Sequence, residues 1–191
     1  MTTTPKPSLI HRISDFLYQK VSTRNILIFF ILDLVFIIGI LPACQKRFDP
    51  NNEIGPIDLL FGFTPEKAYG MLGQMGEAGR SFYLFCEAVV DIIYPMVYVL
   101  FFGLLISLLL SKTYAVGSPW RRLNIIPVIG GIFDLFENTS IVSMILFFEQ
   151  KPAILAQIGS LMNMGKWICF GASVFMVLFG LVRWGIKGFK K

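Results

Sequence analysis

Five carboxylic acids lie within stretches of sequence that are otherwise apolar, and a single basic residue, Lys166, lies in a comparable setting. Ionisable side chains in such surroundings are energetically costly and are therefore candidates for a functional site. Five negative charges against one positive would leave a net charge of −4, so we expect some acids to be protonated or to hold a cation. The five acids are Asp33, Glu87, Asp91, Asp134 and Glu137.

Three of the predicted helices each carry a polar stripe, because their polar residues recur at intervals that share one helix face. Asp33 adds an acid from a fourth helix. At a rise of about 1.5 Å per residue these groups reach overlapping depths, so we expect them to form one cluster that binds a ligand. The stripes are Glu87, Asp91, Tyr94 and Tyr98 on one helix, Asp134, Glu137 and Asn138 on the next, and Asn163 and Lys166 on the last.

The same residues fit a second interpretation, in which a hydrogen-bond network holds the helices together and Lys166 bridges two acids. An excess of four acids over cations is more than such a network requires, which favours a ligand site. Two prolines, Pro95 and Pro127, lie in or near the stripes. A proline within a helix frees a backbone carbonyl, which can then line a cavity.

Four segments are long and apolar enough to cross a bilayer, for which a helix needs about 20 mostly apolar residues. Of the 191 residues, 55% are hydrophobic and 15% charged, whereas soluble domains have about 25% charged residues. Too little polar sequence remains to cover four such helices with a water-facing layer. We therefore expect an all-α integral membrane protein, a four-helix up-down bundle. The predicted spans are 25–43, 80–110, 123–148 and 153–182.

The distribution of lysine and arginine predicts the orientation in the membrane. Eleven of these residues lie in the two tails and in one loop, whereas the opposite loops carry five. Since positive charge accumulates on the cytosolic side, we expect both termini to be cytosolic, in what we take to be a bacterial inner membrane. The predicted cytosolic segments are 1–24, 111–122 and 183–191, and the external ones are 44–79 and 149–152.

Two connecting regions have recognisable patterns. Residues 8–21 place six apolar side chains at helical spacing, which predicts an amphipathic helix on the cytosolic leaflet or, alternatively, packed on a partner subunit. The external loop is expected to be irregular over 51–63 and to start a short helix at Thr64 and Pro65. That helix carries glycines that would either pack flush against another helix or form a flexible connector: Gly70, Gly73, Gly76 and Gly79.

The cysteine and histidine content argues against several chemistries. Cys44, Cys86 and Cys169 form no C-x-x-C pair, which weighs against a thiol-redox enzyme. Cys44 and Cys86 fall on the same predicted side, so both a disulfide and two separate packing residues are compatible with the pattern. The only histidine, His11, lies outside the spans, so haem or transition-metal ligation lacks its usual ligand. No cofactor is predicted, and the nature of any bound metal stays open.

Two short motifs resemble signatures of small four-helix bacterial membrane proteins: Asp-x-x-Tyr-Pro at 91–95 and Asp-x-x-Glu-Asn at 134–138. More weakly, Asp33 and the run from Phe82 to Glu87 that leads to Pro95 are similar to the EXPERA group, the emopamil-binding and sigma-2 receptor-like proteins. This second resemblance covers the first two spans and implies a four-helix bundle that binds sterols and amphipathic amines through buried carboxylates. The histidine that sterol-isomerase members carry is absent from these spans.

These observations predict a membrane bundle that binds or transports a cation, a proton, or an amphipathic cationic or lipid ligand. A structural or accessory subunit of a larger membrane complex is the second hypothesis, and a lipid-modifying enzyme that uses an acid pair is the third. The sequence contains no nucleophilic triad, phosphate loop or zinc motif, which weighs against an enzyme. The expected partners are membrane lipids, a small cation or amphipathic amine, and partner subunits. No nucleic acid is expected, because no basic patch interleaves with exposed aromatic residues.

Overall fold

The computed structural model describes residues 8–189, with side chains up to residue 186. Lys6, Lys190 and Lys191, three of the residues used to predict the orientation, lie outside this range, as does the side chain of Lys187. The described chain is all-helical, as predicted, and contains four helices long and apolar enough to cross a membrane, which points to an integral membrane protein. They run over Thr23–Phe48, Gly76–Thr113, Pro119–Leu146 and Ala153–Ile186.

Each of the first three long helices consists of more than one element, whereas the fourth is a single helix. The first comprises α2 (Thr23–Val35), the π-helical turn η1 (Phe36–Ile40) and α3 (Leu41–Phe48). The second comprises α5 (Gly76–Phe85), the π-helical turn η3 (Cys86–Val90) and α6 (Asp91–Thr113). The third comprises the 3-10 helix η4 (Pro119–Ile125) and α7 (Ile126–Leu146), and the fourth is α8 (Ala153–Phe189).

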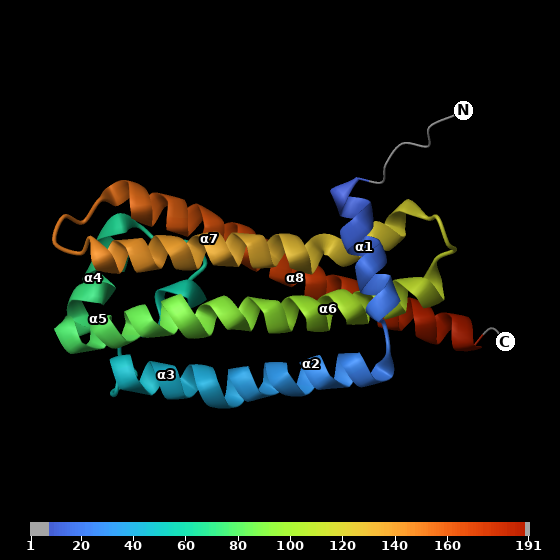
Figure 1. Ribbon diagram of the computed structural model, residues 1–191, viewed down its shortest axis with the longest axis horizontal. Helices are drawn as coiled ribbons and strands as arrows, with labels where there is room; N and C mark the ends of the chain where they lie inside the picture. The colour runs from blue at the N-terminus through green and yellow to red at the C-terminus, as the bar shows by residue number, and fades with distance from the viewer. Residues whose placement is uncertain (1–7, 190–191) are drawn as a thin grey trace.

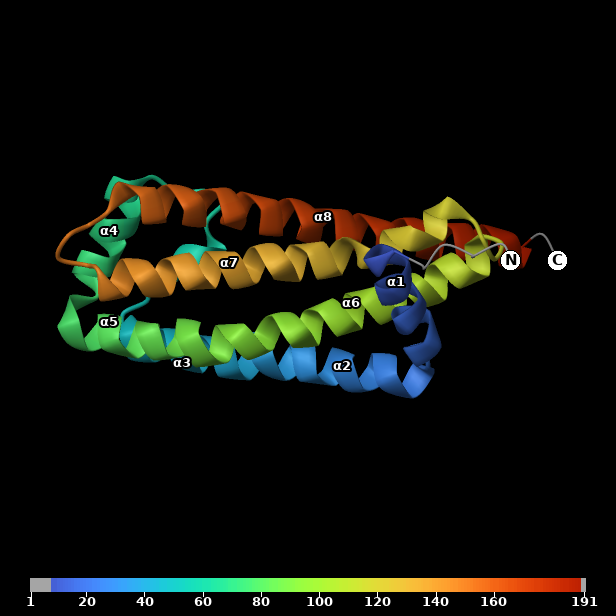
Figure 2. The ribbon, with the colours of Figure 1, turned by 45° about the horizontal axis from the view of Figure 1, so that its top comes forward.

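The four long helices lie alongside one another (Figures 1 and 2). α7 and α8 pack together extensively, α6 packs against both, and the first long helix lies along the second. Within residues 8–189, no contact of similar extent joins the first long helix to the fourth. The first long helix is therefore attached to the bundle chiefly through the second, and much of its apolar surface is exposed, with Ile38 72% exposed.

Both π-helical turns lie next to acids. η1 follows Asp33, and η3 contains Glu87 and ends directly before Asp91. A π-helical turn accommodates one extra residue in a helix and is frequent at functional sites. The helical period on which the predicted stripe depends is therefore irregular at the outer end of the second helix.

A proline in α6 creates a polar link to α7. Pro95 lies inside the helix and has no N–H, so the carbonyl of Asp91, four residues earlier, loses its helical donor. The side-chain amide of Asn138 donates to that carbonyl at 2.5 Å. The freed carbonyl predicted from Pro95 is thus present and joins two helices. Pro127, in contrast, lies in the first turn of α7, where a missing N–H does not interrupt the helix.

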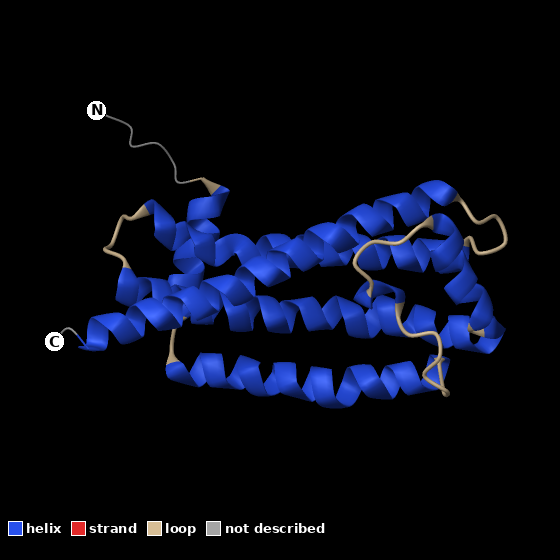
Figure 3. Cartoon of the chain, turned by 180° about the vertical axis from the view of Figure 1, so that it is seen from behind, coloured by secondary structure: helices blue, strands red, loops and turns tan. Residues whose placement is uncertain are grey.

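The segment after α3 turns back toward the bundle (Figure 3). The carboxylate of Asp49 accepts hydrogen bonds from the N–H groups of Glu53, Ile54 and Gly55 at 3.1, 2.9 and 2.8 Å. Burial acts to raise the pKa of Asp49, but these bonds favour the charged form and the net effect lowers the pKa. Beyond this turn, a short 3-10 helix, η2 (Ile57–Leu59), enters the bundle, with Ile57 completely buried.

The helix predicted to begin at Thr64 is confirmed as α4 (Pro65–Gln74). The Thr64 hydroxyl accepts a hydrogen bond from the N–H of Lys67 at 3.2 Å, which caps the helix. The prediction that this helix continues through all four glycines is wrong. α4 ends at Gln74, and Gly76 has a φ of +66°, a conformation that favours glycine and that turns the chain into α5.

Gly79, in α5, shows the close packing that was one of the two predicted roles for these glycines. A Cβ atom added there would lie 3.0 Å from the carbonyl oxygen of Phe48 at the end of α3. The absence of a side chain therefore lets the first and second long helices approach closely at this end. The aromatic ring of Phe48 also packs on that of Tyr83, with 4.6 Å between the centroids.

The predicted N-terminal helix is confirmed as α1 (Leu9–Lys20), which lies across the end of the bundle where α8 terminates (Figure 1). One face packs on the same chain and buries Ser14 and Leu17. The Ser14 hydroxyl donates to the Asn124 carbonyl oxygen at 2.8 Å, and the Asn124 amide donates to Ser107 at 2.8 Å. Three apolar side chains of α1 remain exposed, as in an interfacial helix: Leu9, Ile10 and Phe16.

Candidate functional site

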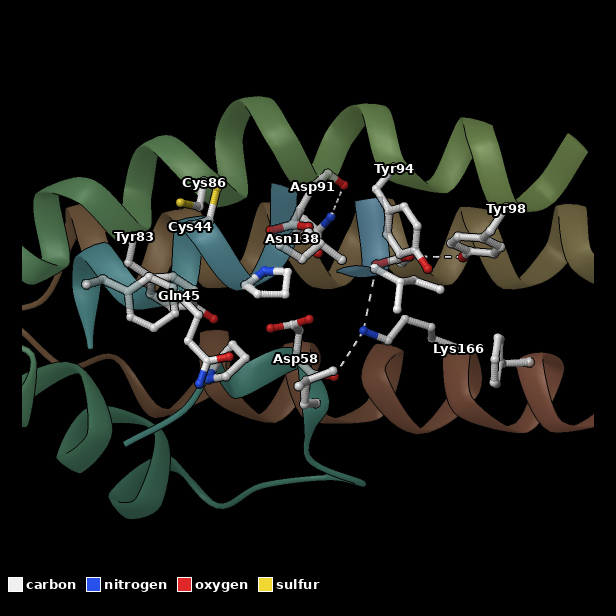
Figure 4. Close-up of a pocket in the computed structure, with 18 of the residues that line it drawn as sticks. Cys44, Gln45, Asp58, Tyr83, Cys86, Asp91, Tyr94, Tyr98, Asn138 and Lys166 are labelled. Atoms are coloured by element: carbon white, nitrogen blue, oxygen red, sulfur yellow. Dashed lines mark hydrogen bonds and ion pairs between the residues drawn. The ribbon is translucent and has the colours of Figure 1, made fainter. Parts of the chain in front are cut away.

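A cavity of about 360 Å³ lies between the four long helices and the segment that enters from the loop (Figure 4). Six of the ten residues predicted to form a site line it: Asp91, Tyr94, Tyr98, Asp134, Asn138 and Lys166. Glu137 and Asn163 lie directly behind the wall and contact Lys166 or the loop. Asp33 and Glu87 are buried but are not among the lining residues.

Lys166 is the centre of the polar network. Its ammonium nitrogen lies 2.5 Å from Glu137 Oε2 and 3.7 Å from Asp134 Oδ1, and it donates to the backbone carbonyl of Asp58 at 3.1 Å. The hydroxyl of Tyr98 donates to the other oxygen of Asp134 at 2.9 Å. Lys166 therefore bridges two acids, as the network interpretation predicted, and its positive charge is already compensated from within the protein.

The fourth long helix also holds the loop inside the bundle. The carbonyl of Asp58 accepts hydrogen bonds from the side chains of Asn163, Lys166 and Trp167 at 2.9, 3.1 and 3.1 Å. The N–H of Gly62 donates to the Asn163 carbonyl oxygen at 2.7 Å. Since Asn163 also donates to Glu137 at 2.7 Å, the loop and the buried acids form one connected network. This anchoring places the Asp58 side chain in the cavity.

Two carboxylates face the cavity without a direct ion pair. Asp91 from α6 and Asp58 from the loop point into it from opposite sides (Figure 4). Among the described residues, the side-chain oxygens of these two acids form no hydrogen bond and no ion pair. Lys166 forms its ion pairs with Glu137 and Asp134 and attracts Asp58 and Asp91 only at longer range. A positively charged group in the cavity would therefore find two acids available to it.

Six of the nineteen residues that line the cavity are aromatic. Tyr94 stacks on Phe36 with 5.3 Å between ring centroids, and Tyr98 meets Tyr94 edge to face at 5.4 Å. Trp167 meets Phe170 edge to face at 5.7 Å. Aromatic faces attract cations within about 6 Å, and their packing against one another keeps them in place. The lining aromatic residues are Phe48, Tyr83, Tyr94, Tyr98, Trp167 and Phe170.

Glu87 and Asp33, both predicted site residues, are displaced from the cavity. Glu87 is fully buried, and neither carboxyl oxygen has a hydrogen-bond partner among the described residues. Asp33 is 6% exposed, and one of its oxygens is similarly unpartnered. The prediction that they face a ligand is therefore not met, although both acids stay close to the cavity. Glu87 interacts with Tyr83 and Asp33 with Tyr94, and both tyrosines line the cavity.

Two thiols lie side by side in the cavity wall. Cys44 of α3 and Cys86 of η3 both line the cavity and are free, and their sulfur atoms are neighbours (Figure 4). Their sequence separation gave no motif, but their predicted positions on one side of the membrane suggested proximity. Cys169 is also free and lies on α8, apart from this pair.

Sequence reasoning missed several lining residues, Asp58 above all, together with Gln45 and Trp167. Asp58 lies in a segment predicted to be an irregular external loop. The apolar residues that surround it, Ile57 and Leu59 to Phe61, were the available signal, because an exposed loop has little reason to be apolar.

No group of three or more potential ligands is placed to hold a metal ion in the part of the chain that the structure describes. Comparisons with protein-family models, curated proteins and solved structures find no match to this chain.

Proposed function

We propose that the chain is an integral protein of the bacterial inner membrane, an up-down bundle of four spans with both termini in the cytosol and α1 on the inner leaflet. The bias of eleven to five in lysine and arginine supports this orientation. α1 and the end of α8 lie at the same end of the bundle (Figure 1), as expected if both termini are on the same side of the membrane. The cavity and its covering loop then lie toward the outer side.

Cysteine labelling tests this orientation in intact cells. Glu53→Cys lies in the predicted external loop, and Val116→Cys replaces a side chain that is 91% exposed in the predicted cytosolic loop. A membrane-impermeant maleimide should label position 53 in intact cells and position 116 only after lysis. Labelling of both positions from the same side would refute the four-span topology.

We propose further that the cavity binds an amphipathic organic cation, most simply an amine with an apolar body. The observation that carries this proposal is the pair Asp58 and Asp91, two carboxylates that face a cavity lined in part by aromatic residues and that form no direct ion pair. An organic cation matches both features, because carboxylates attract its charge and aromatic faces attract its charge and its apolar atoms. Lys166 forms its direct ion pairs with Glu137 and Asp134, so neither Asp58 nor Asp91 has a cationic partner in contact with it.

Binding rather than passage is the better fit to the packing of the bundle. Beyond the cavity, toward α1, the second and fourth long helices are joined by an apolar core of Ile106, Leu110 and Met176. Gly180 also lies so close to Leu109 that a Cβ there would be 2.8 Å away. A cation would have to cross this apolar contact to reach the other end of the bundle, which is costly. We therefore propose a binding site that is closed at its inner end.

Thermal unfolding in lipid nanodiscs tests the proposed binding. The protein should be stabilised by dodecylamine but not by dodecanol, which has the same chain and no charge. A ligand that binds only the folded state, at 100 times its dissociation constant, adds about 2.7 kcal/mol to the free energy of unfolding. Sodium, calcium and tetramethylammonium ions serve as small-cation comparisons. The absence of any stabilisation across this panel would favour the alternative role as an accessory subunit of a membrane complex.

A further inference from the structure

The water-facing end of the cavity is covered by the loop. Pro56, Asp58 and Leu59 line the cavity from that side. Their segment is held on the second long helix by the N–H of Ile57, which donates to the Tyr83 hydroxyl at 3.0 Å, and on the fourth by the three bonds to the Asp58 carbonyl. Further along, the N–H of Phe63 donates to the hydroxyl of Ser160 on α8 at 2.8 Å. This cover is tied to both sides of the cavity, which restricts access from the aqueous side.

A second side of the cavity is less enclosed. The second, third and fourth long helices pack on one another, and the first packs along the second. Among residues 8–189, the first and fourth long helices do not contact each other to a comparable extent, which leaves a seam between them. Residues that line the cavity lie on both sides of this seam. Ile37 on one side is 47% exposed and Phe170 on the other is 37% exposed, although both line the cavity. Each of them therefore borders both the cavity and the outer surface of the bundle.

The seam lies at the level of the hydrocarbon core if the bundle spans a membrane. Ile37 lies eleven residues before the end of its helix at Phe48, which corresponds to about 16 Å. This is about half of the roughly 30 Å thickness of the hydrocarbon core. An opening at this depth meets lipid chains and not water. The cavity is thus acidic near the loop, at Asp58 and Asp91, and apolar at the seam.

We propose that the ligand enters from the bilayer through the seam between the first and fourth long helices and is a long-chain amine. Its charged head lies between Asp58 and Asp91, and its chain leaves the cavity between Ile37 and Phe170. This inference rests on the proposed amine site and specifies the class of ligand and its route. A chain that stays partly in the bilayer explains how a cavity of about 360 Å³ can serve a molecule longer than the cavity itself.

Blocking the seam tests this route. Ile37→Trp fills the lining side of the seam, and Ile38→Trp is its matched control, because Ile38 is the next residue, is 72% exposed and does not line the cavity. We expect Ile37→Trp to weaken the binding of dodecylamine in nanodiscs at least tenfold and Ile38→Trp to change it less than twofold. Phe170→Trp, with the exposed Phe175→Trp as its control, repeats the test from α8 if Ile37→Trp fails to fold.

The outcomes separate the route from the site. Equal dodecylamine binding by the lining and control variants, with binding still lost in Asp91→Asn, would overturn entry through the seam and leave the amine site standing. Equal binding of dodecylamine and dodecanol would overturn recognition of the amine. If wild-type protein binds no amine at all, the proposed function fails and the inference fails with it. Weaker binding in both lining variants, with both controls unaffected, supports the seam.

Discussion

Replacing Asp58 and Asp91 together by asparagine is expected to abolish the stabilisation of the protein by dodecylamine. The two carboxylates face the cavity and form no direct ion pair, so both are available to the ligand. Truncating one partner of a buried charge pair typically costs 2–5 kcal/mol or more, and each single variant should therefore weaken binding by about 30-fold or more. The double variant should show no measurable shift in thermal unfolding.

The same variants should fold as well as the wild type when no ligand is present. An amide keeps the size of the carboxylic acid and removes the repulsion between two acids on opposite sides of one cavity. Glu53→Gln is a matched control, because it removes one negative charge from the same loop at an exposed position. If the double variant still responds to dodecylamine as the wild type does, these acids are not the site. If it unfolds readily without ligand, the acids serve the structure.

Replacing Lys166 by methionine is expected to lower the stability of the folded protein by about 3–5 kcal/mol, the range found when one partner of a buried ion pair is removed. Lys166 lies 2.5 Å from Glu137 and 3.7 Å from Asp134, and it also donates to the carbonyl of Asp58. Its loss strands buried acids and removes one anchor of the loop. Thermal unfolding of the detergent-solubilised protein would measure the change.

A second substitution separates the two consequences of losing Lys166. Glu137→Gln in the Lys166→Met background removes the more closely paired acid, and it should restore most of the lost stability if the stranded charge is responsible. A lack of recovery would mean that Lys166 acts mainly by anchoring the loop. Lys166→Met should also tighten the binding of dodecylamine, because a positive charge beside the ligand is removed. Weakened binding would instead place Lys166 among the groups that shape the site.

The polar stripes of the third and fourth helices could be predicted because residues three or four apart share one face of an α-helix. That rule correctly brought Asp134, Asn138 and Lys166 together on the cavity. It also predicted Glu87, Glu137 and Asn163 as ligand-binding residues, but the structure places these three behind the lining. Whether a residue of a polar stripe lines a cavity or lies behind its wall depends on packing with neighbouring helices, which local spacing does not record.

Asp58 shows the larger limit of prediction from sequence. Its position is set by hydrogen bonds from Asn163, Lys166 and Trp167, which are more than 100 residues away along the chain. The sequence around it contains turn residues and correctly indicated a largely irregular loop. Whether such a loop extends into water or folds into the bundle depends on these distant partners. Asp58, one of the two cavity acids that form no direct ion pair, could therefore be identified only from the tertiary structure.

By itself, the sequence determined that the chain folds into four long apolar helices and that acids outnumber cations within these helices. It also determined that a capped helix begins at Thr64. These properties depend on composition and on local spacing. The tertiary structure decided which acids form ion pairs with Lys166, which two form none, and which residues line the cavity. These outcomes depend on contacts between the second, third and fourth helices and on the poorly packed seam beside the first. Each arises from the relative placement of distant segments, and so no local pattern could specify it.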